Sequence, residues 1–220
     1  MLRGRTAALA AGLLTVVGLL ASILVGTGEA QSPSWVLGVG QLEHRCSLVA
    51  VRPTVVVTAF HCVGSLGATY RVSFVRGVGR DYRSATVVWD GELFGDQTMD
   101  LAILQLDRAV VSVARLASVL PKKGEKGKAV GFSSGVRHWI VPLEFTGLYE
   151  VDGLGWMLGF RAETTGGASG GGIFTDGGEL AAIENVALRE FPTLSFGVPV
   201  GRIRQALRDY DRHGPMQERN

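Results

Sequence analysis

Short apolar runs separated by turns fill the chain from residue 46 to residue 200. The runs are four to nine residues long, and glycine or proline stands in nearly every gap. Such runs, bounded by turn residues, are typical of β-strands, and about a dozen of them favour a β-sandwich or β-barrel. The predicted strands are Cys46–Val51, Thr54–Phe60, Tyr70–Arg76, Tyr82–Trp89, Leu101–Leu106, Lys128–Phe132, His138–Phe145, Gly155–Arg161, Gly171–Phe174, Leu180–Leu188 and Leu194–Val200.

Two segments depart from the strand pattern. Ile203, Leu207 and Tyr210 recur at helical spacing, which predicts a helix over Gly201–Arg212 near the C-terminus. Pro121–Lys128 is the most polar loop, with lysines and a glutamate on a glycine-containing stretch. We expect it to be a solvated surface loop that joins two halves of the fold.

The N-terminal residues have the pattern of a targeting segment. Arg3 and Arg5 precede an uncharged apolar run of 19 residues, Ala7–Val25, close to the roughly 20 residues that span a bilayer. The small residues of Gly28-Glu29-Ala30 suit cleavage by a signal peptidase. Residues 1–30 are therefore predicted to be either a cleaved signal peptide or a retained membrane anchor. In both cases the basic flank predicts an extracytoplasmic location, secreted or periplasmic, for the rest of the chain.

The overall composition describes an ordinary folded protein with an excess of glycine. A hydrophobic content of 46% and a charged content of 19% argue against intrinsic disorder. The net charge of +2, without a basic stripe interleaved with aromatics, predicts no nucleic-acid partner. Glycine contributes 31 of the 220 residues, about twice its usual share, which indicates many turns. The two cysteines can form one disulfide at most.

A histidine and an aspartate lie where proton chemistry would need them. His61 ends a predicted strand at the entrance to a loop, so an imidazole that titrates near neutrality is exposed on a rigid support. Asp100 heads the apolar run Leu101–Leu106, and burying its carboxylate requires a hydrogen-bond partner such as an imidazole N–H. Taken singly, each residue also fits an ordinary role, as a surface histidine or as a turn residue before a strand.

The third feature is a glycine-rich loop over residues 164–172, in which five of nine residues are glycine. A turn there can expose the hydroxyl of Ser169, and the N–H groups of Gly167 and Ser169 can converge on one point. A flexible glycine loop is the plain alternative. A phosphate-binding loop is disfavoured because the lysine of that motif is absent, and an α/β-hydrolase is disfavoured because its acid and histidine follow the serine.

The order His61, Asp100, Ser169 is that of the chymotrypsin-type triad, and here the sequence resembles the trypsin-like serine peptidases. Residues 58–62, TAFHC, resemble the TAAHC box of that family, residues 100–106 its D-I/L-A-L-L-x-L strand, and GGASGG its G-x-S-G-G box. The resemblance spans about residues 44–206. The motif around Ser169 is most similar to that of bacterial members, namely glutamyl endopeptidases and PDZ-bearing periplasmic quality-control proteases. We expect no PDZ domain after the C-terminal helix.

The resemblance implies a fold, a disulfide and a mechanism. The fold is all-β, with two six-stranded antiparallel β-barrels packed together and a C-terminal helix. Residues 31–118 form the barrel with His61 and Asp100, and residues 119–220 form the barrel with Ser169 and the helix. A bridge between Cys46 and Cys62 braces the histidine. The implied activity is that of a serine endopeptidase in which His61, Asp100 and Ser169 are catalytic and the N–H groups of Gly167 and Ser169 form the oxyanion hole.

Departures from the family pattern bear on activation and specificity. Ala168 replaces the aspartate that pairs with a new α-amine in digestive members, so no activation of that kind is expected. The predicted specificity pocket comprises Glu163, Thr164, Thr165 and Glu184. Glu184 stands where glutamyl endopeptidases have a selectivity histidine, and a carboxylate there would favour Arg or Lys side chains. The alternative is that Glu184 points to solvent from a strand edge.

The predicted partner is a protein or peptide substrate. No cofactor is expected, and no metal, because the four histidines are scattered without a zinc-binding pattern. Membrane contact is expected only through residues 7–25, if that segment is not cleaved. The alternative function is that of a catalytically inactive, protease-like binding protein.

Overall fold

The computed structural model describes residues 36–43, 46–76, 79–91, 99–132, 138–163, 167–187 and 193–214. All of them lie in one compact unit, Ser32–Asn220. The predicted signal peptide or anchor lies outside the described residues. Among the described residues, no helix is long and apolar enough to cross a membrane.

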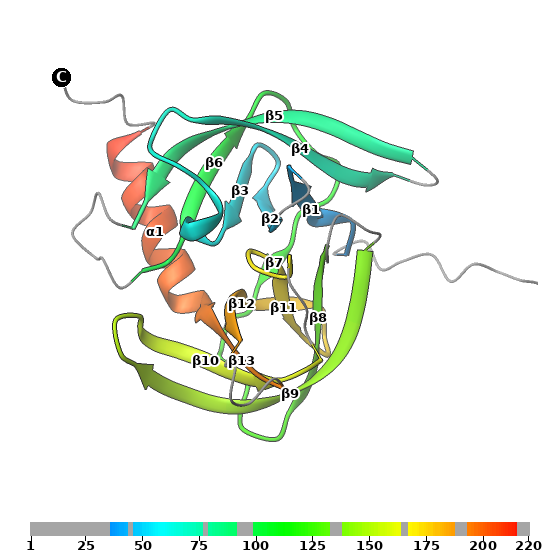
Figure 1. The fold of residues 1–220 in the computed structure, drawn as a ribbon, viewed down its shortest axis with the longest axis vertical. Helices are drawn as coiled ribbons and strands as arrows, with labels where there is room; N and C mark the ends of the chain where they lie inside the picture. Colours follow the sequence, from blue (N-terminus) through cyan, green and yellow to red (C-terminus); the bar gives the residue numbers. More distant parts are fainter. Residues whose placement is uncertain are drawn as a thin grey trace, which may run out of the picture. The chain divides into compact units, whose positions relative to one another are not determined.

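The first half of the described chain forms a closed antiparallel barrel (Figure 1). After a short 3-10 turn, Val36–Gly38, the strands follow the order β1-β2-β3-β6-β5-β4 around the barrel. Its interior is filled by apolar side chains such as Leu48, Leu104 and Val72, which are 0–1% exposed. The strands are β1 (Val39–Leu42), β2 (Cys46–Arg52), β3 (Val55–Thr58), β4 (Thr69–Arg76), β5 (Gly79–Asp90) and β6 (Ala102–Leu106).

The second half forms another closed six-stranded barrel. Its order is β11-β8-β9-β10-β13-β12, and the pairing of β11 with β12 closes the ring, while a two-residue strand, β7 (Arg115–Leu116), adds to β12 in parallel. The strands are β8 (Lys126–Phe132), β9 (His138–Val151), β10 (Gly155–Arg161), β11 (Gly172–Thr175), β12 (Glu179–Ala187) and β13 (Leu194–Pro199). The predicted all-β fold of two six-stranded antiparallel barrels is therefore confirmed.

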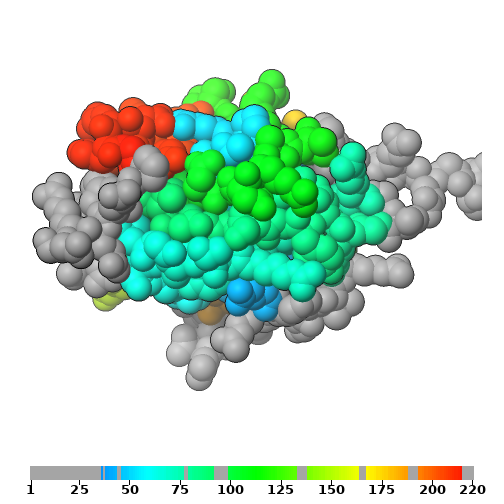
Figure 2. All heavy atoms as spheres, turned by 90° about the horizontal axis from the view of Figure 1, so that it is seen from above, coloured from blue at the N-terminus to red at the C-terminus, as the bar shows by residue number. Residues whose placement is uncertain are grey.

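The C-terminal helix α1 (Val200–His213) continues directly from β13. Its apolar face buries Ile203, Ala206 and Leu207 in a cluster that also contains residues from both barrels. On its outer side, Asp211 accepts two hydrogen bonds from Arg52 of β2, at 2.6 and 2.8 Å. Seen from above, α1 lies at one edge of the face that β4 and β5 cover (Figure 2). The helix predicted from apolar spacing is confirmed.

Several predicted boundaries are wrong at the level of a few residues. Strand β1 was not expected, because its four residues include Gln41 and lack an apolar period, yet all four are buried. Phe60 does not continue a strand, since Phe60–Cys62 form a 3-10 turn. Strand β8 begins at Lys126, two residues before the predicted start at Lys128, because the backbones of Lys126 and Gly127 pair with β9.

Candidate active site

His61 and Asp100 meet at the ends of two paired strands. His61 lies in the 3-10 turn that follows β3, Asp100 lies just before β6, and β3 pairs with β6 up to Thr58 and Ala102. His61 Nδ1 is 2.7 Å from Asp100 Oδ2, and the backbone N–H of His61 donates to Asp100 Oδ1 at 2.9 Å. With the carboxylate ionised, Nδ1 carries the proton and donates it, which leaves Nε2 as the basic nitrogen.

The pairing moves both pKa values in the direction that favours charge. The hydrogen bond with Asp100 raises the pKa of His61 above its ordinary value of 6.5, against the opposing effect of burial. Burial raises the pKa of Asp100, but hydrogen bonds from His61 and Asn185 outweigh it and hold that pKa below 3.8. Asp100 therefore stays ionised near neutral pH and keeps the imidazole in one tautomer.

The predicted disulfide between Cys46 and Cys62 is confirmed. It ties the turn that contains His61 to the start of β2. The ligand atoms of Cys46, His61 and Cys62 lie within 4.8 Å of one another. The two sulfurs are bonded to each other, so they offer no thiolate to a metal ion.

Ser169 lies in a tight turn between residues 168 and 171. The N–H of Gly171 donates to the carbonyl of Ala168 at 2.8 Å, and Gly170, at the third position, has φ of +81°. That combination is a type II turn, whose third position favours glycine. A Cβ at Gly170 would also lie 2.1 Å from the carbonyl oxygen of Ser47. The glycines beside Ser169 therefore serve a required backbone shape and a close approach to β2.

Asn185 of β12 connects Asp100 to Ser169. Its side-chain Nδ2 donates to the backbone carbonyl of Asp100 at 2.6 Å, and its backbone carbonyl accepts from Ser169 Oγ at 3.5 Å. In this structure the Ser169 hydroxyl is therefore directed to Asn185 and not to His61. This connecting role of Asn185 was not predicted from the sequence. The available signal was an amide within the apolar strand β12, since a buried amide needs hydrogen-bond partners.

The two predicted oxyanion donors lie on the same loop. Neither the N–H of Gly167 nor that of Ser169 donates to another described residue, so both remain available within that part of the chain. Their carbonyl oxygens are held by Ser47 of β2. The side-chain Oγ of Ser47 donates to Gly167 at 3.0 Å, and its backbone N–H donates to Ser169 at 2.8 Å.

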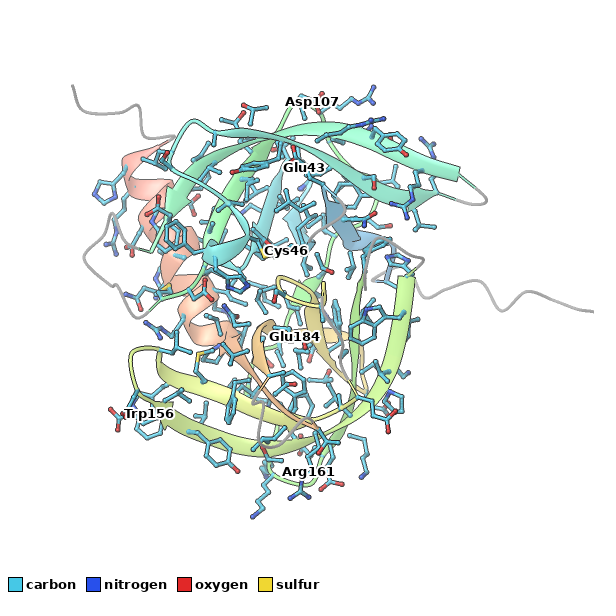
Figure 3. The ribbon with its side chains drawn as sticks, viewed as in Figure 1. Glu43, Cys46, Asp107, Trp156, Arg161 and Glu184 are labelled. Carbon is cyan, nitrogen blue, oxygen red and sulfur yellow. A yellow bond between two sulfur atoms is a disulfide. The ribbon has the colours of Figure 1, made fainter. Side chains whose placement is uncertain are left out.

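The predicted specificity residues have different surroundings. Glu163 is exposed, and Thr164 and Thr165 lie outside the described residues. Glu184 is only 4% exposed, and its backbone bonds to Gly170 and Gly171 beside the Ser169 turn (Figure 3). The alternative that Glu184 points to solvent is therefore wrong. Its selection of basic substrate side chains stays a prediction.

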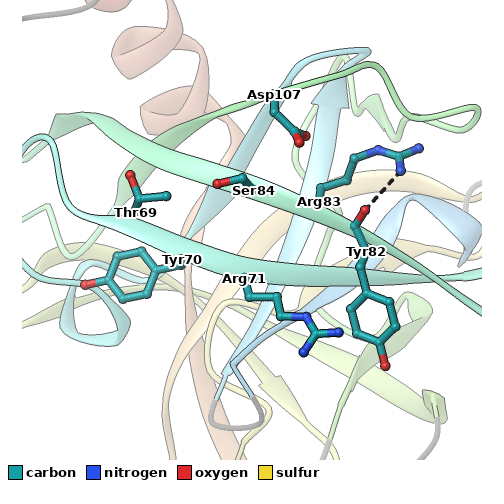
Figure 4. A pocket seen from close by; sticks show the side chains of 7 residues that line it. All are labelled: Thr69, Tyr70, Arg71, Tyr82, Arg83, Ser84 and Asp107. Carbon is teal, nitrogen blue, oxygen red and sulfur yellow. Dashed lines mark hydrogen bonds between the residues drawn. The ribbon is translucent and has the colours of Figure 1, made fainter.

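A separate hollow of about 360 Å³ lies on β4 and β5 (Figure 4). Arg83, a buried lining residue, donates to the carbonyl of Tyr82 and pairs with Asp81. None of its lining residues is a predicted site residue, so the hollow does not belong to the candidate active site. The lining residues are Thr69, Tyr70, Arg71, Tyr82, Arg83, Ser84 and Asp107.

Comparison with known sequences gives one family match. The model of the trypsin-like peptidase domain matches residues 46–183, which include His61, Asp100 and Ser169. A search of curated proteins found no significant match.

Solved structures of bacterial proteases share the fold. The Rv3671c protease from M. tuberculosis matches in its active form (TM-score 0.69, 18% identity, 84% of each chain covered). It also matches in an inactive form (TM-score 0.65, 19% identity, 80% of this chain and 90% of that chain). The serine endoprotease from Yersinia pestis matches with a TM-score of 0.68 and 18% identity, over 83% of this chain and 65% of the other. The HtrA-type protease AlgW, solved with a tripeptide, matches with a TM-score of 0.68 and 17% identity, over 82% of this chain and 62% of the other.

Proposed function

Because the chain belongs to the trypsin-like peptidase domain family and thus to the serine-type endopeptidases, we propose that it is an active enzyme with His61, Asp100 and Ser169 as its catalytic residues. The observation that carries this proposal is the two-point contact between His61 and Asp100, at 2.7 and 2.9 Å. That contact fixes both the ring orientation and the tautomer, which a general base of this type requires. The substrate is a protein or a peptide.

The proposed reaction passes through an acyl-enzyme. Ser169 Oγ attacks the carbonyl carbon of the scissile bond while His61 Nε2 takes the hydroxyl proton. The N–H groups of Gly167 and Ser169 stabilise the oxyanion that forms. As the intermediate collapses, His61 returns the proton to the leaving amine, and the same steps with water in place of the serine release the acyl group.

One rearrangement must precede this chemistry. Ser169 Oγ donates to the carbonyl of Asn185 at 3.5 Å, a long and therefore weak hydrogen bond. The proposed mechanism requires the hydroxyl to exchange that bond for one to His61 Nε2. Catalytic hydrogen bonds often tighten only when substrate binds, so the arrangement without substrate is compatible with activity.

The proposed location is outside the cytoplasm. The basic flank and apolar run of residues 3–25 support export of the chain, either with cleavage after Ala30 or with the run retained as an anchor. The disulfide between Cys46 and Cys62 supports the same location, because such bonds persist in oxidising compartments.

The decisive experiment uses the full chain and its Ser169→Ala variant. A fluorophosphonate should label the wild-type protein at Ser169, as located by peptide mass spectrometry, and the wild type should hydrolyse casein or a peptide library. Ser169→Ala should not be labelled, and its rate of hydrolysis should be lower by at least about 10³-fold, because the nucleophile is gone. Ser84→Ala, at an exposed serine of β5, is the matched control and should keep both. N-terminal sequencing of the same preparation should begin at Gln31 for a cleaved signal and at Met1 for an anchor.

Two outcomes would count against the proposal. Hydrolysis by Ser169→Ala at the wild-type rate would show that another residue or a contaminant is the nucleophile. A folded wild-type protein that neither reacts with the fluorophosphonate nor cleaves any peptide would favour the alternative of an inactive, protease-like binding protein.

A further inference from the structure

Ser47, the second residue of β2, connects the first barrel to the loop that holds Ser169. Its side chain is fully buried, at 0% exposed. Its Oγ donates to the carbonyl of Gly167 at 3.0 Å and accepts from the N–H of Phe132, at the end of β8, at 2.7 Å. One hydroxyl thus joins three segments that are far apart in the sequence.

The backbone of Ser47 makes two further contacts at the same place. Its N–H donates to the carbonyl of Ser169 at 2.8 Å, and its carbonyl accepts from Thr58 Oγ1 at 2.7 Å. The side chain therefore holds Gly167, the backbone holds Ser169, and Thr58 holds Ser47. Both residues that supply the proposed oxyanion donors are bound to this single residue.

An external anchor matters because the loop itself is easily deformed. Gly167 has φ of +96°, a conformation that glycine enters and leaves at little cost. Rotation about its φ and ψ changes the relative directions of its N–H and its carbonyl. The carbonyl of Gly167 is held by Ser47 Oγ, and that of Ser169 is held two residues later by the Ser47 N–H. The N–H of Ser169 lies between these two held groups, and the N–H of Gly167 extends from a Cα that is held on one side.

We propose that Ser47 is a positioning residue that keeps the N–H groups of Gly167 and Ser169 aimed at the oxyanion. This inference rests on the proposed function of Ser169. In Ser47→Ala, the carbonyl of Gly167 and the N–H of Phe132 lose their partner, so the Gly167 end of the loop loses its anchor while the backbone bond to Ser169 remains. Oxyanion contacts are strongest in the transition state, so their misalignment lowers kcat more than it raises KM.

The first test compares Ser47→Ala with the wild-type full chain. We expect kcat to fall about 10- to 100-fold, since removal of a whole oxyanion donor costs about 10² to 10³. KM and the acid limb of the pH profile should stay near their wild-type values, because the Ser47 hydroxyl does not contact His61 or Asp100. A merely unfolded fraction would lower kcat but would leave the exchange rates of the folded fraction unchanged. Amide hydrogen exchange of peptides covering residues 167–171 should therefore be faster in Ser47→Ala.

The matched control is Ser73→Ala. Ser73 is another buried serine of the first barrel, 5% exposed, and its hydroxyl accepts from Arg80 at 3.1 Å. It lies on β4, and among the described residues it makes no hydrogen bond with residues 167–171. Its removal should leave kcat and the exchange of residues 167–171 unchanged.

A second variant reaches the same hydroxyl without removing it. A Cβ at Gly131 would lie 2.9 Å from Ser47 Oγ but 3.6 Å from Ser47 Cβ. Gly131→Ala should therefore displace the hydroxyl and lower kcat in the wild-type background. In the Ser47→Ala background the same change meets only an ordinary van der Waals contact, so it should have little further effect. Such non-additivity identifies the hydroxyl itself as the anchor.

The outcomes separate this inference from the proposed function. An active wild type whose kcat and exchange are unaffected by Ser47→Ala, or fully additive effects of Ser47→Ala and Gly131→Ala, would overturn the role of Ser47 and leave Ser169 as the nucleophile. An inactive wild type would overturn the proposed function. In that case the exchange of residues 167–171 still decides whether Ser47 holds the loop.

Discussion

At the scale of single residues, the candidate site depends on hydrogen bonds that set protonation. Asp100 receives bonds from the ring and the backbone of His61, and its own carbonyl receives the amide of Asn185. The two bonds from His61 to the carboxylate stabilise its negative charge and, through it, the positive imidazolium. The result is a histidine that holds its proton to a higher pH than a free imidazole does.

The pH profile of hydrolysis should reflect that raised pKa. His61 acts as a base only when it is neutral, so kcat/KM should rise with pH through a midpoint above 6.5. Asp100→Asn removes the carboxylate, which should lower kcat/KM by about 10⁴-fold and move the midpoint to lower pH. Asp107→Asn, at an exposed aspartate of the same barrel, is the control. A midpoint at or below 6.5 in the wild type would contradict the role assigned to the pair.

His61, Asp100 and Ser169 are candidates from the sequence because each lies in a local context that suits its proposed chemistry. His61 follows a strand, Asp100 leads one, and Ser169 lies among glycines. The partners of Asn185 and Ser47 could not be predicted, because those contacts span 85 and 120 positions. Nothing in the residues next to them in the sequence indicates those partners.

At the scale of secondary-structure elements, α1 is held by apolar burial more than by charge. Ile203 is 0% exposed and Leu207 5% exposed, both within the cluster that contains residues of the two barrels. The Arg52–Asp211 pair is bidentate, but its side chains are 39% and 50% exposed. Water and salt screen such a pair, so it contributes little to stability.

Two substitutions on α1 should therefore differ in cost. Ile203→Ala should lower the free energy of unfolding by about 2–5 kcal/mol, because it leaves a cavity among packed side chains. Asp211→Ala should lower it by no more than about 1 kcal/mol. Urea unfolding of both variants measures the difference. A larger loss for Asp211→Ala than for Ile203→Ala would show that the ion pair, and not burial, fixes the helix.

The elements were more predictable than their ends. Long apolar runs with turn residues on both sides, such as Gly155–Arg161, were located to the residue. Strand β1 was not predicted, because its pairing with β2 and β4 depends on tertiary packing and its sequence has no alternation of apolar and polar residues. Gly40 there accommodates Phe74 and Leu48, whose side chains would lie within 2.9 Å of a Cβ. The two-residue β7 is too short for any periodicity.

At the scale of the whole described unit, a second histidine, His138, lies where the two barrels meet. His138, at the start of β9, contacts the carbonyl of Val39 in β1 through Nε2 at 2.9 Å, and its ring lies 4.5 Å from that of Phe132. Burial lowers the pKa of His138 and the charge of Arg80 lowers it further, while the Val39 carbonyl opposes both. The family resemblance predicted two packed barrels, but no local pattern indicated a contact across 99 positions.

His138 should make the protein less stable in acid. The folded state resists protonation of His138, whereas the unfolded chain accepts a proton near pH 6.5. Stability should therefore fall as pH drops from about 6.5 toward the lowered pKa. The raised pKa of His61 acts in the opposite direction, so each variant is compared with the wild type. His138→Gln should flatten the decline in Tm between pH 7 and pH 5, and His213→Gln, at an exposed histidine, should not. An unchanged slope in His138→Gln would contradict the assignment.

The turn at Gly170 limits which amino-acid substitutions the fold can accept. Any side chain at that position would overlap the Ser47 carbonyl at 2.1 Å and the Thr58 hydroxyl at 2.2 Å. The fold could accept a larger residue at position 170 only if the backbones of β2 and β3 shifted as well. A single substitution in the loop does not produce that shift. Substitutions at position 170 of the loop are therefore coupled to the positions of β2 and β3 in the other barrel. At this contact, residue 170 and the backbones of β2 and β3 can change only together.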